Sequence, residues 1–409
     1  MKRTAAMMLI ALLASLTPGA APAQVPANPH TAQLNLDPMV REGFNAFYNL
    51  DFDGALKTFR VVAQQHPNDP MAWDYILLVT IFQELYVQDL LDTTYYARDN
   101  FLTNKRQVDV PPNIRSEIEL LTNKVIQMTD AELKADPNGV NPNDKDAYFE
   151  RGYAKGLHAA FLTLADHSYA AAARQGYSSR NDSEAALKID PQYADAKMAV
   201  GIQQFAVASL PGWVRLLVGM MGVGGNKERG LSLLRESAAH GVVTSVESRT
   251  ALSLFLRHDG RYPEALTVQR GLAKEFPHDY LYRLEVANLL KDEGHGEEAI
   301  AEYKHVIDDG MKPGYFFGPR LQLAWFGMAD TMRGYNHIQD AAYAYTQAAQ
   351  TPDCSDWLRK RAELAAGQMD DLLHNRAAAV AMYRKVLTPG DQSQAEAARR
   401  GLQAPYQGK

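Results

Sequence analysis

Cysteine is nearly absent from this chain of 409 residues, which contains Cys354 alone. A single cysteine cannot form an intramolecular disulfide, and it cannot supply the cysteine cluster of a structural zinc site. Basic residues are also in deficit, because 42 Lys and Arg stand against 48 Asp and Glu and leave a net charge of −6. Such a balance lacks the basic surface that phosphate backbones require. We therefore expect no nucleic-acid partner.

Motifs of catalysis and cofactor binding are missing as well. The eleven histidines form no His-Glu-x-x-His pattern, and no Gly-x-Ser-x-Gly elbow occurs. The glycine cluster over 219–230 is not a phosphate loop, because Asn226 interrupts the Gly-Lys-Ser/Thr pattern. The oxygen-rich stretch Asp136–Asp146 is not an EF-hand loop, because Ala147 stands where the bidentate glutamate would be. We predict a protein that is not an enzyme and that binds no cofactor or metal.

The N-terminus has the three-part pattern of a secretory signal peptide. Lys2 and Arg3 precede an apolar run over residues 5–16, and small residues at Ala21 and Ala23 follow a helix-breaking Pro-Gly pair. The apolar run of about twelve residues is too short to span a bilayer, which needs roughly 20. We predict cleavage after Ala23 and export, to the periplasm, with no membrane association beyond the signal peptide.

Strand signals are also scarce, and the dominant pattern is a helical repeat. Ala265 and Ala299 are 34 residues apart within two similar segments, and Gly260 and Gly294 occupy matching turn positions. The same helix-B pattern recurs around Ala55 and near the C-terminus. Further matching positions are Gly43, Phe59, Pro67, Pro277, Ala379 and Tyr383. The pattern resembles the tetratricopeptide repeat (TPR) family, and the resemblance implies an all-α fold, an α-solenoid of antiparallel helix pairs.

Between these repeats the sequence is less regular. An apolar-periodic pattern predicts a long helix over residues 70–102, and prolines at 111–112 predict a break. A second helix follows to about Lys134, and Asp136–Asp146 is typical of a linker. We therefore divide the chain into a signal peptide (1–23), N-terminal TPR-like helices (24–140) and a TPR-like array (141–409), within one continuous superhelix.

A narrower resemblance covers about 35 residues of the middle region. It consists of a Gly-x-x-x-Phe helix that ends in Ser-Leu-Pro, a short apolar helix, a glycine loop and a Gly-Leu-x-x-Leu helix. The matching residues are Gly201, Phe205, Ser209, Leu210, Pro211, Gly222, Gly225, Asn226, Lys227, Gly230, Leu231 and Leu234. This segment resembles the tetratricopeptide repeat protein 39 family. The resemblance implies a scaffold, because that family has no established catalytic residues.

The TPR resemblance also implies which side chains face the concave groove of the array. Some are aromatic and belong to the first repeat, and the others are basic or polar and lie over residues 257–291. They are Phe44, Phe47, Tyr48, Arg257, His258, Asn288 and Lys291. Aromatic rings offer contact area, and basic and amide groups can hold a peptide carboxylate or backbone. An alternative is that the aromatics pack as core and that the basic side chains are solvated.

Two functions fit these observations. The first is an exported TPR-type scaffold or adaptor that binds a protein or peptide partner in its concave groove. The alternative is a carrier that holds a small apolar ligand or lipid in a pocket of the irregular middle region. Its support is the apolar pattern over 70–102 and the aromatic pattern over 148–164, both of which core packing also explains.

Overall fold

The structure is a computed structural model that describes residues 28–95, 108–135, 141, 144–212, 215 and 224–408. The predicted signal peptide (1–23) lies outside the described residues. So do most of the non-helical part of the 136–146 linker and most of the short apolar segment before Gly224.

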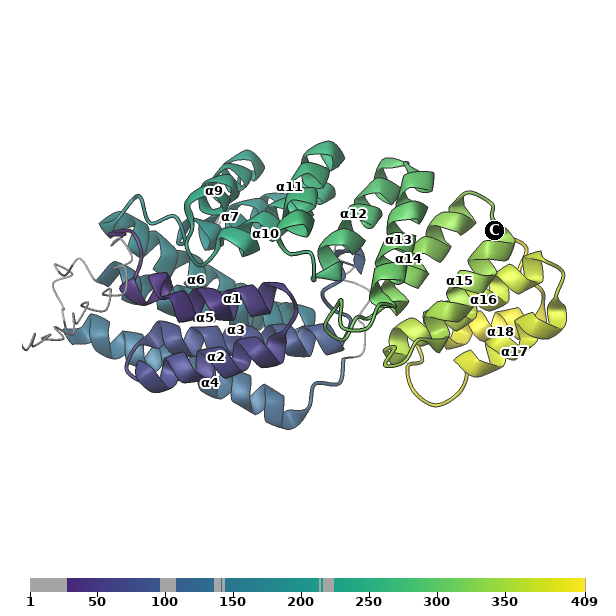
Figure 1. Ribbon diagram of the computed structural model, residues 1–409, viewed down its shortest axis with the longest axis horizontal. Helices are drawn as coiled ribbons and strands as arrows, with labels where there is room; N and C mark the ends of the chain where they lie inside the picture. Colours follow the sequence, from purple (N-terminus) through teal and green to yellow (C-terminus); the bar gives the residue numbers. More distant parts are fainter. Residues whose placement is uncertain are drawn as a thin grey trace, which may run out of the picture.

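Helices form the regular structure of the described residues, which include no β-strand (Figure 1). The elements are η1 (Gln33–Leu36), α1 (Pro38–Tyr48), α2 (Phe52–Gln65), α3 (Pro70–Val87), η2 (Thr93–Tyr95), α4 (Pro112–Ala135), α5 (Asp144–Leu164), α6 (Tyr169–Ile189), α7 (Lys197–Ser209), α9 (Lys227–His240), α10 (Ser245–His258), α11 (Tyr262–Glu275), α12 (Tyr280–Glu293), α13 (Gly296–Gly310), α14 (Gln322–Gly334), α15 (Ile338–Gln350), α16 (Asp356–Leu372), α17 (Arg376–Val386) and α18 (Ala395–Gln403). Each helix packs mainly against its neighbours in sequence, which is the contact pattern of an α-solenoid. The expected fold class is confirmed.

Small residues lie where paired helices meet. Ala265 of α11 and Ala299 of α13 have no exposed surface, as the repeat register predicts. The equivalent alanines and the aromatic residues that follow them by four positions are also fully buried. They are Ala55, Ala341 and Ala379, with Phe59, Tyr303, Tyr345 and Tyr383. A small side chain lets the two backbones approach, and the ring one turn later fills the space beside the next helix.

The turns between paired helices need left-handed backbone at one residue. Gly260 and Gly294, the glycines at matching positions of the two repeats, have φ angles of 73° and 95°. A residue without Cβ adopts this conformation at little cost. The prediction that these glycines form the turns between helices A and B is confirmed.

The helix that starts at Pro70 is shorter than the predicted span of 70–102. It ends at Val87, and Gln88 is its C-cap. Asp89 then has a φ of 57°, so the backbone leaves the helix there. The apolar pattern continues past this point because Leu90 is buried by tertiary contacts, not because the helix continues.

The glycine-containing helix α5 packs closely on α6. Adding a Cβ to Gly152 would bring it against the backbone of Ser179, whose hydroxyl donates a hydrogen bond of 2.6 Å to the Gly152 carbonyl. α5 also packs on α3 and α4, on the other side of the proposed boundary near residue 140. One hydrophobic core therefore runs through both parts of the chain.

The superhelix brings the first helices back against the later ones. In Figure 1, α1 and α3 lie beneath the arc formed by α9 to α12. Tyr48 of α1 packs on Phe276 after α11, with ring centroids 5.3 Å apart, and Tyr86 of α3 lies 6.4 Å from the ring of Tyr280. The N-terminal helices thus lie against the inner side of the C-terminal array.

Candidate functional site

A short segment after α3 crosses the inner side of the array. We call Asp89–Thr94 the groove segment, and we call the surface under it, formed by α10, α12 and the starts of α14 and α16, the groove. Tyr86, near the end of α3, holds the chain just before the crossing, because its hydroxyl donates a hydrogen bond of 2.8 Å to the carbonyl of Gly318. The groove segment makes polar contacts with the groove at both of its ends and at one point between them.

At the first end, one carboxylate receives several donors. Asp89, whose side chain has no exposed surface, forms an ion pair with Nε of Arg320. Nε2 of Gln322 donates to the same oxygen over 3.0 Å, and the backbone N–H of Ser355 lies 3.4 Å from the other oxygen. Burial alone lowers the pKa of Arg320, but the Asp89 carboxylate outweighs this and raises it. Arg320 is thus a charged, desolvated receptor for a carboxylate.

At the other end, a hydroxyl lies on a buried arginine. Arg257, 3 % exposed, forms ion pairs with Glu285 at 3.0 Å and with Asp292 at 2.7 Å. Its Nη1 also donates a hydrogen bond of 2.8 Å to Oγ1 of Thr93, and Thr93 in turn donates to Glu285. Burial lowers the pKa of Arg257, but the two carboxylates raise it by more, so the guanidinium stays charged. Its charge is already neutralised, which suits a neutral hydroxyl ligand.

Between the two ends, an amide contacts a second carboxylate. Nδ2 of Asn288 lies 3.4 Å from Oδ1 of Asp92 and 3.2 Å from Oε2 of Glu285. The hydroxyl of Tyr303 donates a hydrogen bond of 2.6 Å to Oδ1 of Asn288 and so fixes which side of the amide faces the segment. The contact with Asp92 is long and is the weakest of the three.

The predicted aromatic residues are in the interior and not on an open surface. Phe44, Phe47 and Tyr48 are all buried. Phe44 packs edge-on against Tyr75 of α3, and Phe47 does the same against Phe82. The expectation that these rings are exposed in a groove is wrong, because α3 returns over α1 and the α11–α12 corner covers Tyr48. The alternative, core packing under the helix that begins at Pro70, is what the structure shows.

The predicted polar residues divide into two groups. Arg257 and Asn288 meet in the groove, as expected, but both are buried beneath the groove segment and are not exposed. His258 lies away from it, with its ring 5.9 Å from that of Phe205. Lys291 is half-buried on α12. The expectation of a solvent-facing cationic surface is therefore corrected for Arg257 and Asn288, because a segment of the same chain covers them.

Sequence reasoning missed several of the residues that form this site, among them Asp89, Thr93, Glu285 and Arg320. Asp89 was inside the span predicted as helix, and Arg320 lies in the connection before α14, outside the repeat pattern. An aspartate next to two leucines within a predicted core helix was the available signal, because a buried carboxylate needs a partner.

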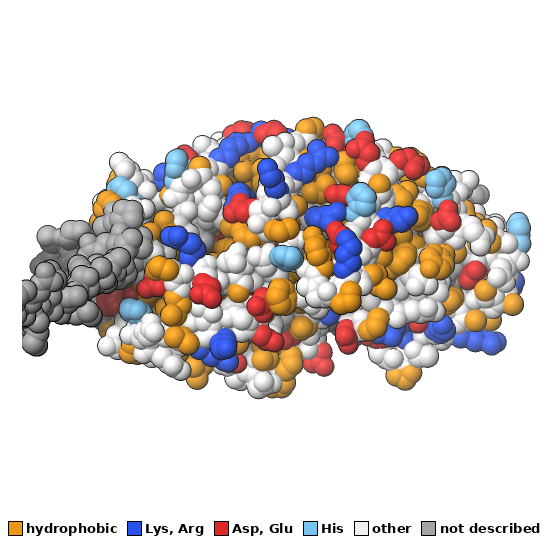
Figure 2. Space-filling view, viewed as in Figure 1, with side chains coloured by type: hydrophobic (Ala, Val, Ile, Leu, Met, Phe, Trp, Pro, Cys, Tyr) orange, Lys and Arg blue, Asp and Glu red, His pale blue; other side chains and the backbone are white. Residues whose placement is uncertain are grey.

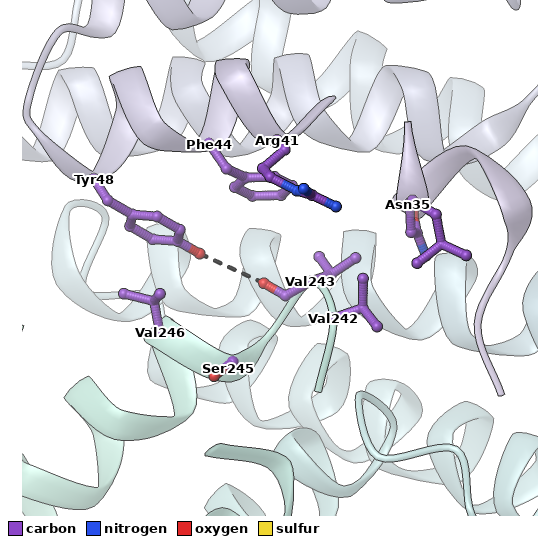
Figure 3. A pocket seen from close by; sticks show the side chains of 9 residues that line it. Asn35, Arg41, Phe44, Tyr48, Val242, Val243, Ser245 and Val246 are labelled. Atoms are coloured by element: carbon purple, nitrogen blue, oxygen red, sulfur yellow. Dashed lines mark hydrogen bonds between the residues drawn. The ribbon is translucent and has the colours of Figure 1, made fainter. Parts of the chain in front are cut away.

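A cavity of about 110 Å³ lies between α1 and the connection from α9 to α10 (Figure 3). The exposed guanidinium of Arg41 lies beside it, and the hydroxyl of Tyr48 reaches the carbonyl of Val243 at 3.5 Å. The other lining residues are Asn35, Leu36, Phe44, Val242, Ser245 and Val246. Pockets that enclose drug-sized ligands measure roughly 300–1,000 Å³, so this cavity matches a single aliphatic side chain.

The described part of the glycine-rich loop acts as a connector. A Cβ on Gly225 would meet the backbone at Gln204 and Ala208 of α7, and Asn226 caps α9 by accepting a hydrogen bond from Arg229. The surface over α9 to α15 shows basic and acidic side chains interspersed, not one sign alone (Figure 2). Among the helices that the structure describes, none combines the length and the hydropathy needed to cross a membrane.

A comparison with protein-family models and with curated protein sequences gives no match. Similar solved structures include PilF of Pseudomonas aeruginosa, with 16 % identity and a TM-score of 0.38 over 63 % of this chain and 97 % of that one. Yeast Tom70 is similar over 88 % of this chain and 87 % of its own, with 11 % identity and a TM-score of 0.42. A tetratricopeptide repeat protein from Parabacteroides merdae is similar over 82 % of this chain and 99 % of its own, with 11 % identity and a TM-score of 0.37.

Proposed function

We propose that this chain is an exported, periplasmic TPR-type scaffold that binds a protein or peptide partner in the groove. One observation supports the binding role above all others. The groove holds a segment of polypeptide through side chains, with a receptor for a carboxylate at one end and a receptor for a hydroxyl at the other. A surface that orders one such segment has the chemistry to order another.

The burial of the receptor groups explains how the groove could be selective. Arg257, Asn288 and Arg320 are all nearly inaccessible, and each is held by a neighbour other than the groove segment. Donors that are already oriented lose little freedom when a ligand binds. A wrong ligand would leave them buried without partners, which is costly.

We extend the proposal to kinship with the tetratricopeptide repeat protein 39 family. The glycines of the resembling segment support it. Gly201 of α7 and Gly230 of α9 lie at the crossing of the two helices, and a Cβ on either would press on the carbonyl of the other. The motif therefore describes a close helix crossing, a property of a scaffold and not of a reaction centre.

A carrier of a small apolar ligand or lipid has weaker support. The cavity beside α1 is too small for such a ligand, and the apolar helix α3 and the aromatic residues of α5 are used in the core. A second hollow of about 390 Å³, along α15 and the end of α16, includes Gln339, Thr346, Asp370 and Asn375 in its lining. Those polar groups do not suit a lipid tail.

The partner-binding proposal can be tested by site-specific photo-crosslinking in the cells that produce the chain. A photoreactive residue in place of Lys291, the residue of α12 predicted to face the groove, should give one dominant crosslinked product that mass spectrometry identifies. The same residue in place of the exposed Lys304, on the opposite helix α13, is the matched control. Equal product patterns at both positions would count against a partner in the groove.

The export proposal has a separate test. N-terminal sequencing of the protein isolated from its native cells should find Gln24 as the first residue, because cleavage after Ala23 removes the signal peptide. Replacing Ala23 by Arg should block cleavage and retain the precursor. A mature protein that begins at Met1 would contradict export by this route.

A further inference from the structure

The groove segment and the groove residues that it contacts come from distant parts of the chain. Asp89 and Arg320 are 231 residues apart, and Thr93 and Arg257 are 164 apart. The groove segment is not a piece of the repeat array, because α3 has ended and only the short η2 lies within the crossing. It meets the array as a ligand would, across the inner ends of successive first helices.

We propose that Asp89–Thr94 is a built-in, displaceable occupant of the groove, and that the partner is a protein with an acidic segment that takes its place. The inference rests on the proposed binding function for the partner, and on the structure alone for the occupant. The chain would thus hold its own binding site closed until a competing segment arrives.

The contacts specify the chemistry of the competing segment. The Arg320 end takes a carboxylate, because Gln322 and the N–H of Ser355 add two donors to the guanidinium. The Arg257 end takes a hydroxyl, because Glu285 and Asp292 already neutralise the guanidinium. The groove segment places these groups four residues apart, so the expected partner pattern is Asp-x-x-Asp-Thr or Asp-x-x-Asp-Ser.

Displacement is feasible because the polar contacts are replaceable one for one. Asp89, Asp92 and Thr93 contact the groove through side chains, and a partner with the same groups would restore their hydrogen bonds to Arg320, Gln322, Asn288 and Arg257. Leu90 is almost fully buried and Leu91 packs against the core while partly buried, so a leucine or similar residue after the first aspartate completes the pattern.

The test uses the full chain and a fluorescent synthetic peptide with the sequence of residues 88–94, Gln-Asp-Leu-Leu-Asp-Thr-Thr. The anchor variant, Asp89→Asn with Thr93→Val, keeps the shape of both side chains and removes the contacts that hold the segment. We expect the peptide to bind this variant at least about tenfold more tightly than the unmodified chain, because a site that is occupied nine-tenths of the time weakens a competitor by that factor.

Three controls separate this result from general loosening. Asp308→Asn with Thr267→Val makes the same chemical changes at exposed positions of α13 and α11 and should leave peptide binding as in the unmodified chain. Arg320→Gln added to the anchor variant should abolish binding. A peptide with Asn, Asn and Val in place of both Asp and the first Thr should not bind.

A folded anchor variant that fails to bind the peptide would overturn the proposal, and so would equal affinity for the unmodified chain. If the anchor variant does not fold, hydrogen exchange on the unmodified chain decides. Millimolar peptide should speed exchange of the Leu90 amide, which is bonded to the Leu85 carbonyl, and leave α17 unchanged. Unchanged exchange at Leu90 would show a fixed structural contact and overturn the proposal.

These outcomes are independent of the partner experiment. Peptide binding without a crosslinked partner at position 291 would remove the proposed function and leave the displaceable segment in place. A crosslinked partner with no peptide binding would support the proposed function and remove the displaceable segment.

Discussion

At the α1 end of the contact between the N-terminal helices and the array, Tyr48 packs on Phe276 among other aromatic rings. At the α3 end, the contact consists of the Arg320–Asp89 and Arg257–Glu285 ion pairs and a threonine hydroxyl. The aromatic contact depends on shape and buried area, so many apolar side chains could maintain it. The polar contact depends on particular donors and acceptors, and the loss of one leaves another unpaired. The first is suited to holding the superhelix together, and the second to recognising a sequence.

The largest expected effect comes from breaking the polar contact. Arg257→Ala removes the guanidinium that pairs with Glu285 and Asp292 and leaves their carboxylates buried. The free energy of unfolding should fall by about 3–5 kcal/mol, measured by urea denaturation. Arg333→Ala, which loses an exposed pair with Asp330 at 3.6 Å, should cost less than about 1 kcal/mol. Similar losses for both variants would contradict the difference between buried and exposed pairs.

A second change tests the repeat packing on which both contacts rest. Ala299→Leu inserts three carbon atoms where α13 meets its partner helix and has no exposed surface to accommodate them. Overpacking of this kind should lower the free energy of unfolding by about 1–3 kcal/mol. Ala301→Leu, at an exposed position of the same helix, is the control. A melting temperature unchanged by Ala299→Leu would show that the register is wrong.

The aromatic contact should tolerate substitution better. Phe47→Leu keeps an apolar side chain but loses ring contacts with Tyr48, Phe52 and Phe82. We expect a cost of about 1–2 kcal/mol, with the same value at pH 5 and pH 8 because no charge is involved. A loss as large as that of Arg257→Ala, or one that changes with pH, would remove the distinction between the two contacts.

The smallest effect concerns pH. Burial raises the pKa of Glu247 to about 8, and its carboxylate accepts a hydrogen bond of 2.6 Å from Tyr153. The folded state therefore binds more protons than the unfolded state between about pH 4.5 and 8, so stability should fall as pH rises through this window.

Glu247→Gln should flatten this decline, which for one proton is at most about 1.4 kcal/mol per pH unit. Unfolding in urea at pH 5, 6.5 and 8 measures it. Part of the slope should remain, because burial also raises the pKa of Asp279 to about 8. Glu119→Gln, at an exposed position of α4, should change nothing. A slope that Glu247→Gln leaves intact would exclude this residue as its source.

The sequence predicts local features of this fold well. Ala265, Ala299, Gly260 and Gly294 follow from spacing and steric rules that act within one hairpin. The helix over 70–102 was overextended because apolar periodicity reports burial and does not distinguish a helix from a segment buried by distant residues. Leu90 satisfied the pattern without being helical.

The candidate site also shows what the repeat pattern can and cannot predict. The repeat register placed Arg257 and Asn288 together on the inner face, and they do meet there. It could not show that Thr93 and Asp92 would cover them, because those contacts join segments more than 160 residues apart. Periodicity specifies which face of a helix is inner, and only the closed superhelix determines what lies against it.

The return of α1 and α3 onto the array also changes how the chain should fold. In an open solenoid each hairpin contacts only its neighbours, so unfolding can proceed from either end, one repeat at a time. Here Tyr86 and Asp89 contact residues more than 230 positions later, which couples the first repeats to those around α14. Such distant contacts raise the contact order and slow folding. A nascent chain can complete its early hairpins on the ribosome, but it cannot close the groove until residues beyond Ser355 have emerged.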